Sequence, residues 1–76
     1  MTWEDSALHS ALIDYQGGYR GYVSTYAFSG LGKPGYIAKF RHPVDGWMDE
    51  DLGEFPTVEE AKSALVARVA QYILSH

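Results

Sequence analysis

The chain contains no cysteine, which excludes disulfide bonds and thiolate metal sites. Its stability must therefore come from apolar packing, for which two Trp, six Tyr and three Phe are available. No apolar run approaches the roughly 18 residues that a membrane-spanning helix needs. No basic segment followed by an apolar one marks a secretory signal at Met1. We therefore expect no membrane association and a cytoplasmic location.

Basic residues are scarce as well. Ten acidic residues stand against six Lys and Arg, giving a formal net charge of −4. This balance argues against a nonspecific grip on nucleic acid, because such a grip depends on cations that neutralise phosphates. Between residues 45 and 60 there is no Lys or Arg, but seven acids occur there: Asp45, Asp49, Glu50, Asp51, Glu54, Glu59 and Glu60.

At 76 residues the chain has the length of one domain, residues 1–76, with one small core. Its clearest element is a helix over residues 57–76. Thr57, followed three residues later by Glu60, forms a capping box directly after Pro56. Apolar residues then recur at steps of three and four, at Val58, Ala61, Leu65, Val66, Val69, Tyr72 and Ile73. This stripe predicts a helix that packs on the core.

A second helix is expected over residues 3–14, with Thr2 as its cap. Apolar residues at helical spacing indicate it: Trp3, Ala7, Leu8, Ala11, Leu12 and Tyr15. The segment Gln16-Gly17-Gly18 ends this helix in a turn, because two successive glycines lose too much backbone entropy to remain helical.

Two strands follow this turn. Residues 19–28 are rich in aromatic and β-branched side chains, and the large side chains of Tyr22, Tyr26 and Phe28 are expected to face the helices. After a glycine-rich loop over 29–35, residues 36–42 predict a second strand antiparallel to the first. Its alternation places Tyr36, Ala38 and Phe40 toward the core, and Ile37, Lys39 and Arg41 away from it.

A short third strand is expected within residues 47–55, at a sheet edge, because charge there discourages edge-to-edge pairing. The predicted fold class is therefore α+β in the order α-β-β-β-α. It is a three-stranded antiparallel meander with two helices packed on one face.

The acidic stretch is the candidate binding site. It comprises Asp45, Trp47, Met48, Asp49, Glu50, Asp51 and Glu54. Its carboxylates would steer a basic partner, and an exposed Trp47 would anchor the interface. Burial of Trp47 in the core is the other interpretation, and it is favoured because large aromatic residues in small domains are mostly needed for burial. A Ca²⁺ or Mg²⁺ site at Asp45, Asp49, Glu50 and Asp51 is a further alternative, although the spacing does not match an EF-hand loop.

Catalytic and metal motifs are not evident. His9, His42 and His76 lie apart, with no two at ligand spacing. His42 lies near the acidic stretch, but no nucleophile is arranged with it. We therefore expect a non-enzymatic protein without a metal or other cofactor.

The expected α-β-β-β-α order resembles the double-stranded-RNA-binding domain, and Glu60-Ala61-Lys62-Ser63-Ala64 is similar to the start of that family's second helix. The resemblance implies binding of double-stranded RNA through a lysine cluster at that helix start. Here Val58, Glu59 and Glu60 occupy those positions, and an acidic helix start repels phosphates.

Two further segments resemble the HicB-type antitoxins of bacteria. Gly35-Tyr36-Ile37-Ala38 is similar to that family's strand, and Thr57-Val58-Glu59-Glu60-Ala61 is similar to the segment that opens its helix. The family's Pro-Asp-x-Pro-Gly turn is absent, with only His42-Pro43-Val44-Asp45-Gly46 at that place. The resemblance implies a small bacterial regulator that acts by binding another protein.

The sequence thus predicts a small non-catalytic protein-interaction module of the regulator, antitoxin, immunity or inhibitor type, which presents its acidic loop to a protein with a basic surface. The alternative is a nucleic-acid-binding domain that uses four basic residues with the tyrosines of the sheet: Arg20, Lys33, Lys39 and Arg41. The charge balance argues against this alternative. The sequence leaves the oligomeric state and the partner's identity open.

Overall fold

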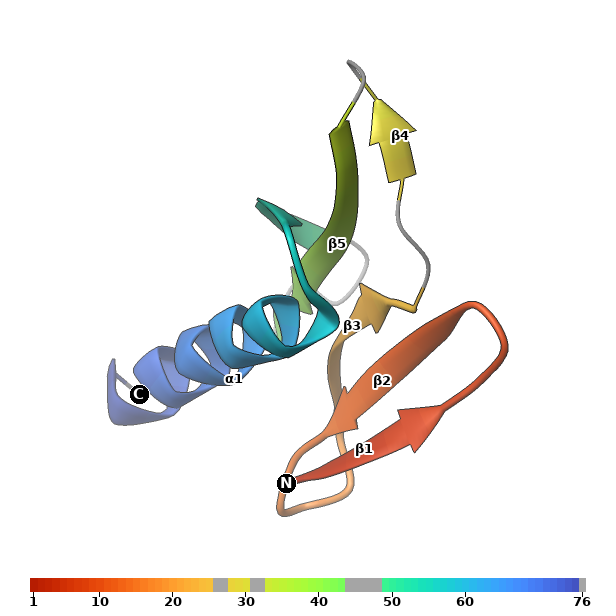
Figure 1. Cartoon of the computed structure of the whole chain (residues 1–76). Coiled ribbons are helices and arrows are strands. Elements are labelled where there is room, and N and C mark those ends of the chain that lie inside the picture. Colours follow the sequence, from red (N-terminus) through yellow and green to blue (C-terminus); the bar gives the residue numbers. More distant parts are fainter. Residues whose placement is uncertain (26–27, 31–32, 44–48, 76) are drawn as a thin grey trace.

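The computed structural model of the chain describes residues 1–25, 28–30, 33–43 and 49–75. Its elements are β1 (Thr2–Asp5), β2 (His9–Ile13), β3 (Tyr19–Ser24), β4 (Phe28–Gly30), β5 (Lys33–Arg41), β6 (Asp49–Phe55) and α1 (Val58–Ser75). All of the strand pairs are antiparallel, and α1 lies across one face of the sheet (Figure 1). The chain is an α+β protein in which the strands come first and the helix last.

The sheet is centred on β3 and β5, which pair with each other. On one side the order continues through β2 to β1, and on the other β6 pairs with β5. The short strand β4 pairs with the start of β5, and this pair extends beyond the helix (Figure 1). Within the described residues, β1 and β6 are therefore the two edges of the main sheet.

The predicted order α-β-β-β-α, with two helices and three strands, is wrong. Residues 3–14 form most of the β1–β2 hairpin instead of a helix. The physical reason is that the edge of β3 not used by β5 needs a hydrogen-bonding partner, which β2 supplies. The turn before β2 is closed by the Ser6 amide, which donates to the His9 carbonyl over 2.8 Å.

The first predicted strand is shorter than expected, and its inward face is the opposite one. Val23 is fully buried beneath the helix, whereas its neighbour Tyr22 points to the other side of the sheet. Tyr26 and the side chain of Phe28 lie outside the described part of the structure. Much of the expected loop over 29–35 is strand, because β4 and the start of β5 form a hairpin with Phe28 opposite Gly35.

The predictions for β5 and β6 are confirmed more closely. Ala38 and Phe40 are buried on the helix side, and Lys39 lies on the opposite side. The acidic strand β6 pairs with β5 alone within the described part of the chain, so it is an edge strand as expected.

The C-terminal helix is confirmed, although His76 lies outside the described residues. The Thr57 hydroxyl accepts a hydrogen bond of 3.1 Å from the Glu60 amide at the helix start. One stripe of the helix packs on the sheet to form the core, which comprises Leu12, Val23, Ala38, Phe40, Ala61, Leu65 and Val69. Ile73, expected in this stripe, is 49% exposed, because the last turns of α1 reach past the core.

Candidate functional site

One face of the sheet is covered by α1, and no described element covers the other. We call this second surface the open face. On each strand the residues that point there alternate with those of the core, and strand pairing aligns them into rows across the sheet. The open face comprises Thr2, Glu4, His9, Ala11, Ile13, Tyr19, Tyr22, Ser24, Ile37, Lys39 and Arg41, together with Asp49, Asp51 and Glu54 on β6.

Aromatic and cationic side chains meet at the centre of the open face. The Arg41 guanidinium lies 4.9 Å from the centre of the Tyr19 ring, and its Nε donates to Asp49 Oδ1 over 2.9 Å. This hydrogen bond raises the pKa of Arg41, and burial raises the pKa of Tyr19. Tyr22 makes an edge contact with His9 at 5.5 Å between ring centres. The central side chains thus hold one another in place.

Tyr19 reaches the open face because of an irregularity in β3. The register shifts between Leu12 and Ile13, so that Ile13 pairs with Tyr19 while Arg20 has no partner opposite it. Arg20 instead forms an ion pair of 2.7 Å with Asp14 in the β2–β3 turn. The extra residue therefore places Tyr19 on the open face, where unbroken alternation from Tyr22 would have placed Arg20.

The predicted acidic site is divided between the two faces of β6. Asp49, Asp51 and Glu54 lie on the open face, opposite Arg41, Lys39 and Ile37 respectively. Glu50 points to the helix side, where it binds Arg68. Asp45, Trp47 and Met48 lie outside the described residues, so their part of the prediction stays a prediction.

The basic residues of the alternative site are likewise divided. Lys39 and Arg41 lie side by side on the open face, each opposite a carboxylate-bearing residue of β6. Arg20 turns toward Asp14. Lys33 begins β5 in the hairpin with β4, and only its backbone is described.

A polar cluster that sequence reasoning missed joins β5, β6 and α1. Glu50 accepts two hydrogen bonds from Arg68, 2.6 Å from Nε and 3.3 Å from Nη2, and His42 Nε2 lies 3.4 Å from the same carboxylate. The Arg68 guanidinium also lies over the buried Phe40 ring, at 4.6 Å from its centre. The hydrogen bond from Arg68 is the main cause that lowers the pKa of Glu50.

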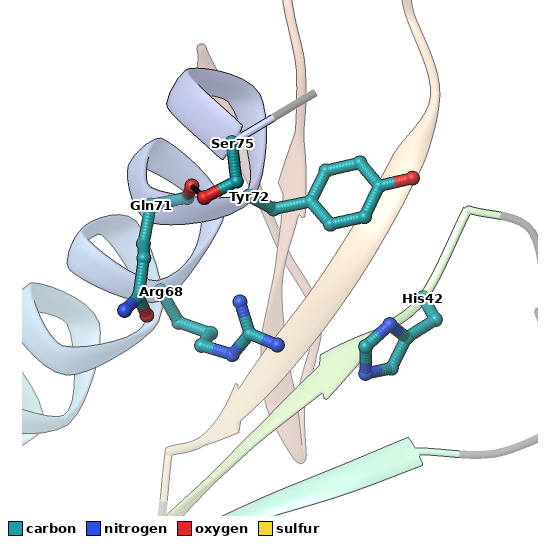
Figure 2. Close-up of a pocket in the computed structure, with 5 residues that line it drawn as sticks. All are labelled: His42, Arg68, Gln71, Tyr72 and Ser75. Carbon is teal, nitrogen blue, oxygen red and sulfur yellow. Dashed lines mark hydrogen bonds between the residues drawn. The ribbon is translucent and has the colours of Figure 1, made fainter.

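Beside this cluster is a shallow hollow of about 430 Å³, which we call the helix-end hollow. It is lined by His42, Arg68, Gln71, Tyr72 and Ser75. Figure 2 shows the Arg68 guanidinium reaching from α1 toward His42 at the end of β5. The Ser75 hydroxyl donates to the Gln71 carbonyl over 2.8 Å. The Arg68–Glu50 pairing itself has no local sequence signal, because its members lie 18 residues apart.

A second hollow, of about 390 Å³, lies on the other side of Tyr72. Tyr15 and Ile73 give it an exposed apolar rim, and Asp14 and Arg20 form an ion pair within it. This ion pair leaves the polar part of the second hollow with balanced charge.

No group of three His, Asp or Glu side chains close enough to hold a metal ion occurs in the described ranges. Among the same residues, no helix has the length and apolar character needed to cross a membrane.

Comparison of the chain with protein-family models, with curated proteins and with solved structures gave no match in any of the three searches. These results do not bear on the resemblances to HicB-type antitoxins and to the double-stranded-RNA-binding domain, which stay predictions.

Proposed function

We propose that the chain is a non-catalytic protein-interaction module of the regulator, antitoxin, immunity or inhibitor type, and that it binds its partner through the open face. The observation that carries this proposal is the composition of a sheet face that no described element covers. Two tyrosines and two isoleucines, Tyr19, Tyr22, Ile13 and Ile37, lie there among the polar residues that usually face water on an antiparallel sheet. Tyr and Arg are also the residue types that most often dominate the energy of protein interfaces.

The charges on the open face favour a protein partner over nucleic acid. Two cations, Lys39 and Arg41, stand beside three carboxylates on β6, and Arg41 is already bound to Asp49. A phosphate backbone needs several free cations and would be repelled by the β6 carboxylates. A protein surface can instead place basic groups opposite β6 and apolar groups opposite Tyr19 and Ile13.

The acidic residues of β6, which we call the acidic flank, indicate that the partner has a basic surface. Asp51 and Glu54 are exposed and form no ion pair within the described residues. They are therefore available to steer a basic protein toward the open face, and this attraction weakens as salt screens it. The predicted role of Asp45, Trp47 and Met48 is retained in this proposal, as an extension of the same acidic flank.

The proposal is tested by capturing partners from a native lysate with matched variants. Tyr22→Ala removes an aromatic side chain from the open face, and Tyr15→Ala removes one that is 81% exposed elsewhere. We expect a partner that binds the parent and Tyr15→Ala but binds Tyr22→Ala at least tenfold more weakly, since an interface hot spot is worth about 2 kcal/mol. Circular dichroism checks that both variants fold.

A second pair of variants tests the charges. Asp51→Asn with Glu54→Gln should slow association with the captured protein at low salt, whereas Glu59→Gln with Glu60→Gln on α1 should not. Equal binding by all variants would refute the proposal. Loss of the captured material after nuclease treatment would instead favour the nucleic-acid alternative at Lys39 and Arg41.

A further inference from the structure

We infer that the helix-end hollow is a binding site for a phosphate group, either as the free ion or as a phosphate monoester. This inference does not depend on the proposed partner site, because the hollow lies on the helix side of the sheet and the open face lies on the other. Two features of the hollow favour a phosphate group: the way Arg68 is held, and the hydrogen-bonding groups that surround it.

Arg68 is fixed before any ligand arrives. Glu50 binds its Nε and Nη2 atoms, and the Phe40 ring supports the flat face of the guanidinium. The side chain is only 23% exposed. A ligand therefore meets a cation whose conformational entropy is already lost, which is the condition under which an arginine fork binds an oxyanion most effectively.

The guanidinium retains unused donors. It has five N–H groups, of which Glu50 takes two, and no acceptor among the described residues takes the other three. The hollow is also lined by Gln71 on α1, which has a side-chain amide, and by His42, which directly follows β5. At neutral pH a phosphate group carries at most one or two protons, and its other oxygens are hydrogen-bond acceptors. It therefore matches a lining in which donors predominate.

Two effects oppose anion binding here. Ser75 lies in the last turn of α1, where the helix dipole disfavours an anion by a factor of about two to five. The Glu50 carboxylate balances the charge of Arg68 and repels the anion, so the attraction comes from the three remaining N–H donors of the guanidinium and not from a net positive charge. Charge-assisted hydrogen bonds from arginine favour binding by about tenfold or more. Binding should thus be selective but weak.

Arg41 provides a matched control on the opposite face of the sheet. It also binds a carboxylate of β6 through Nε and also lies over an aromatic ring, but it does not line the helix-end hollow. Arg41→Gln and Arg68→Gln therefore remove the same charge from similar surroundings. Only Arg68→Gln removes a group that lines the hollow.

The experiment is a titration of the ¹⁵N-labelled chain with inorganic phosphate and with phenyl phosphate, at constant ionic strength, with sodium acetate as the carboxylate comparison. We expect saturable shifts of the Arg68, Gln71 and Ser75 amides with both phosphates. Arg68→Gln should weaken binding about tenfold, Arg41→Gln should change it by less than about twofold, and Glu50→Gln should strengthen it. Tighter binding of phenyl phosphate than of the free ion would support a monoester as the ligand.

Shifts that do not saturate, equal weakening by Arg41→Gln and Arg68→Gln, or equal affinity for acetate would each overturn the inference. If Arg68→Gln does not fold, the double variant Gln71→Ala with Ser75→Ala replaces it. Both of its residues are exposed at the end of α1, so the fold should survive. Phosphate binding should then weaken by about threefold, and an unchanged affinity would again count against the site. Partner capture by Tyr22→Ala reports on the open face and not on this hollow.

Discussion

Gly21 on β3 lies close to both the neighbouring strand β5 and the helix. Its φ of +143° lies in a region that other residues rarely adopt. A Cβ atom at this position would lie 2.2 Å from the Lys39 carbonyl oxygen and 3.0 Å from Leu65 Cδ1. The backbone of β5 and the Leu65 side chain of α1 therefore occupy the space that any side chain at position 21 would need.

Gly21→Ala should lower the free energy of unfolding by about 2–5 kcal/mol, because backbone strain and overpacking act together. Chemical denaturation measures this change. Gly17→Ala is the matched control, since Gly17 also has a positive φ, of 82°, but has open space around it. Its cost should stay near 1–2 kcal/mol. Equal costs would show that space at Gly21 is not limiting.

Among the elements, α1 provides three of the seven buried core residues in the described part of the chain, all from a single stripe. Leu65 is fully buried there, and Leu74, nine positions later on the same helix, is 88% exposed. Leu65→Ala should cost about 2–5 kcal/mol of stability, whereas Leu74→Ala should change it by about half a kcal/mol or less. Thermal unfolding of the two variants measures the contrast. Similar midpoints would mean that a different face of α1 packs on the sheet.

The start of α1 depends on Thr57, whose hydroxyl binds the Glu60 amide. Thr57→Ala should cost about 1 kcal/mol, because that amide then lacks its acceptor. Thr57→Ser, which keeps the hydroxyl, should recover most of the loss in the same denaturation experiment. A serine variant no better than the alanine one would mean that the cap contributes little.

The whole molecule should lose stability in acid through two carboxylates. A hydrogen bond from the Gly18 amide is the main cause that lowers the pKa of Asp14, and the Arg68 hydrogen bond lowers that of Glu50. When folding lowers the pKa of a carboxyl group, its ionised form stabilises the fold at pH values above the unfolded pKa. This stability is lost as the pH falls through the folded pKa. Stability should therefore begin to fall near pH 4.5, the ordinary value for Glu50, and continue to fall below pH 3.8, that for Asp14.

Variants separate the two contributions. Glu50→Gln and Asp14→Asn should each flatten the decline of the melting temperature with acid, because a neutral amide cannot titrate. Asp14→Asn keeps an oxygen for the Gly18 and Gln16 amides, so it should also retain more stability at neutral pH than Asp14→Ala.

The sequence by itself determined the elements whose signals are local. The capping residue Thr57 and the stripe through Leu65 specify α1, because a helix satisfies its hydrogen bonds within its own segment. The alternation through Ala38 and Phe40 specifies β5, and the crowded acids of β6 specify an edge.

Only the tertiary structure decided the state of the N-terminal third and the composition of the sites. A helix stripe fits the spacing of Ala7, Leu8, Ala11 and Leu12. Without β2, however, one edge of β3 would have no hydrogen-bonding partner. Pairing with that edge stabilises the strand around Leu12 by more than the helix propensity of the segment opposes it. Tyr22 faces away from the core because the close contact at Gly21 and the buried Val23 fix the register of β3. The open face and the Arg68–Glu50–His42 cluster likewise depend on pairing between distant segments, which no local pattern in the sequence encodes.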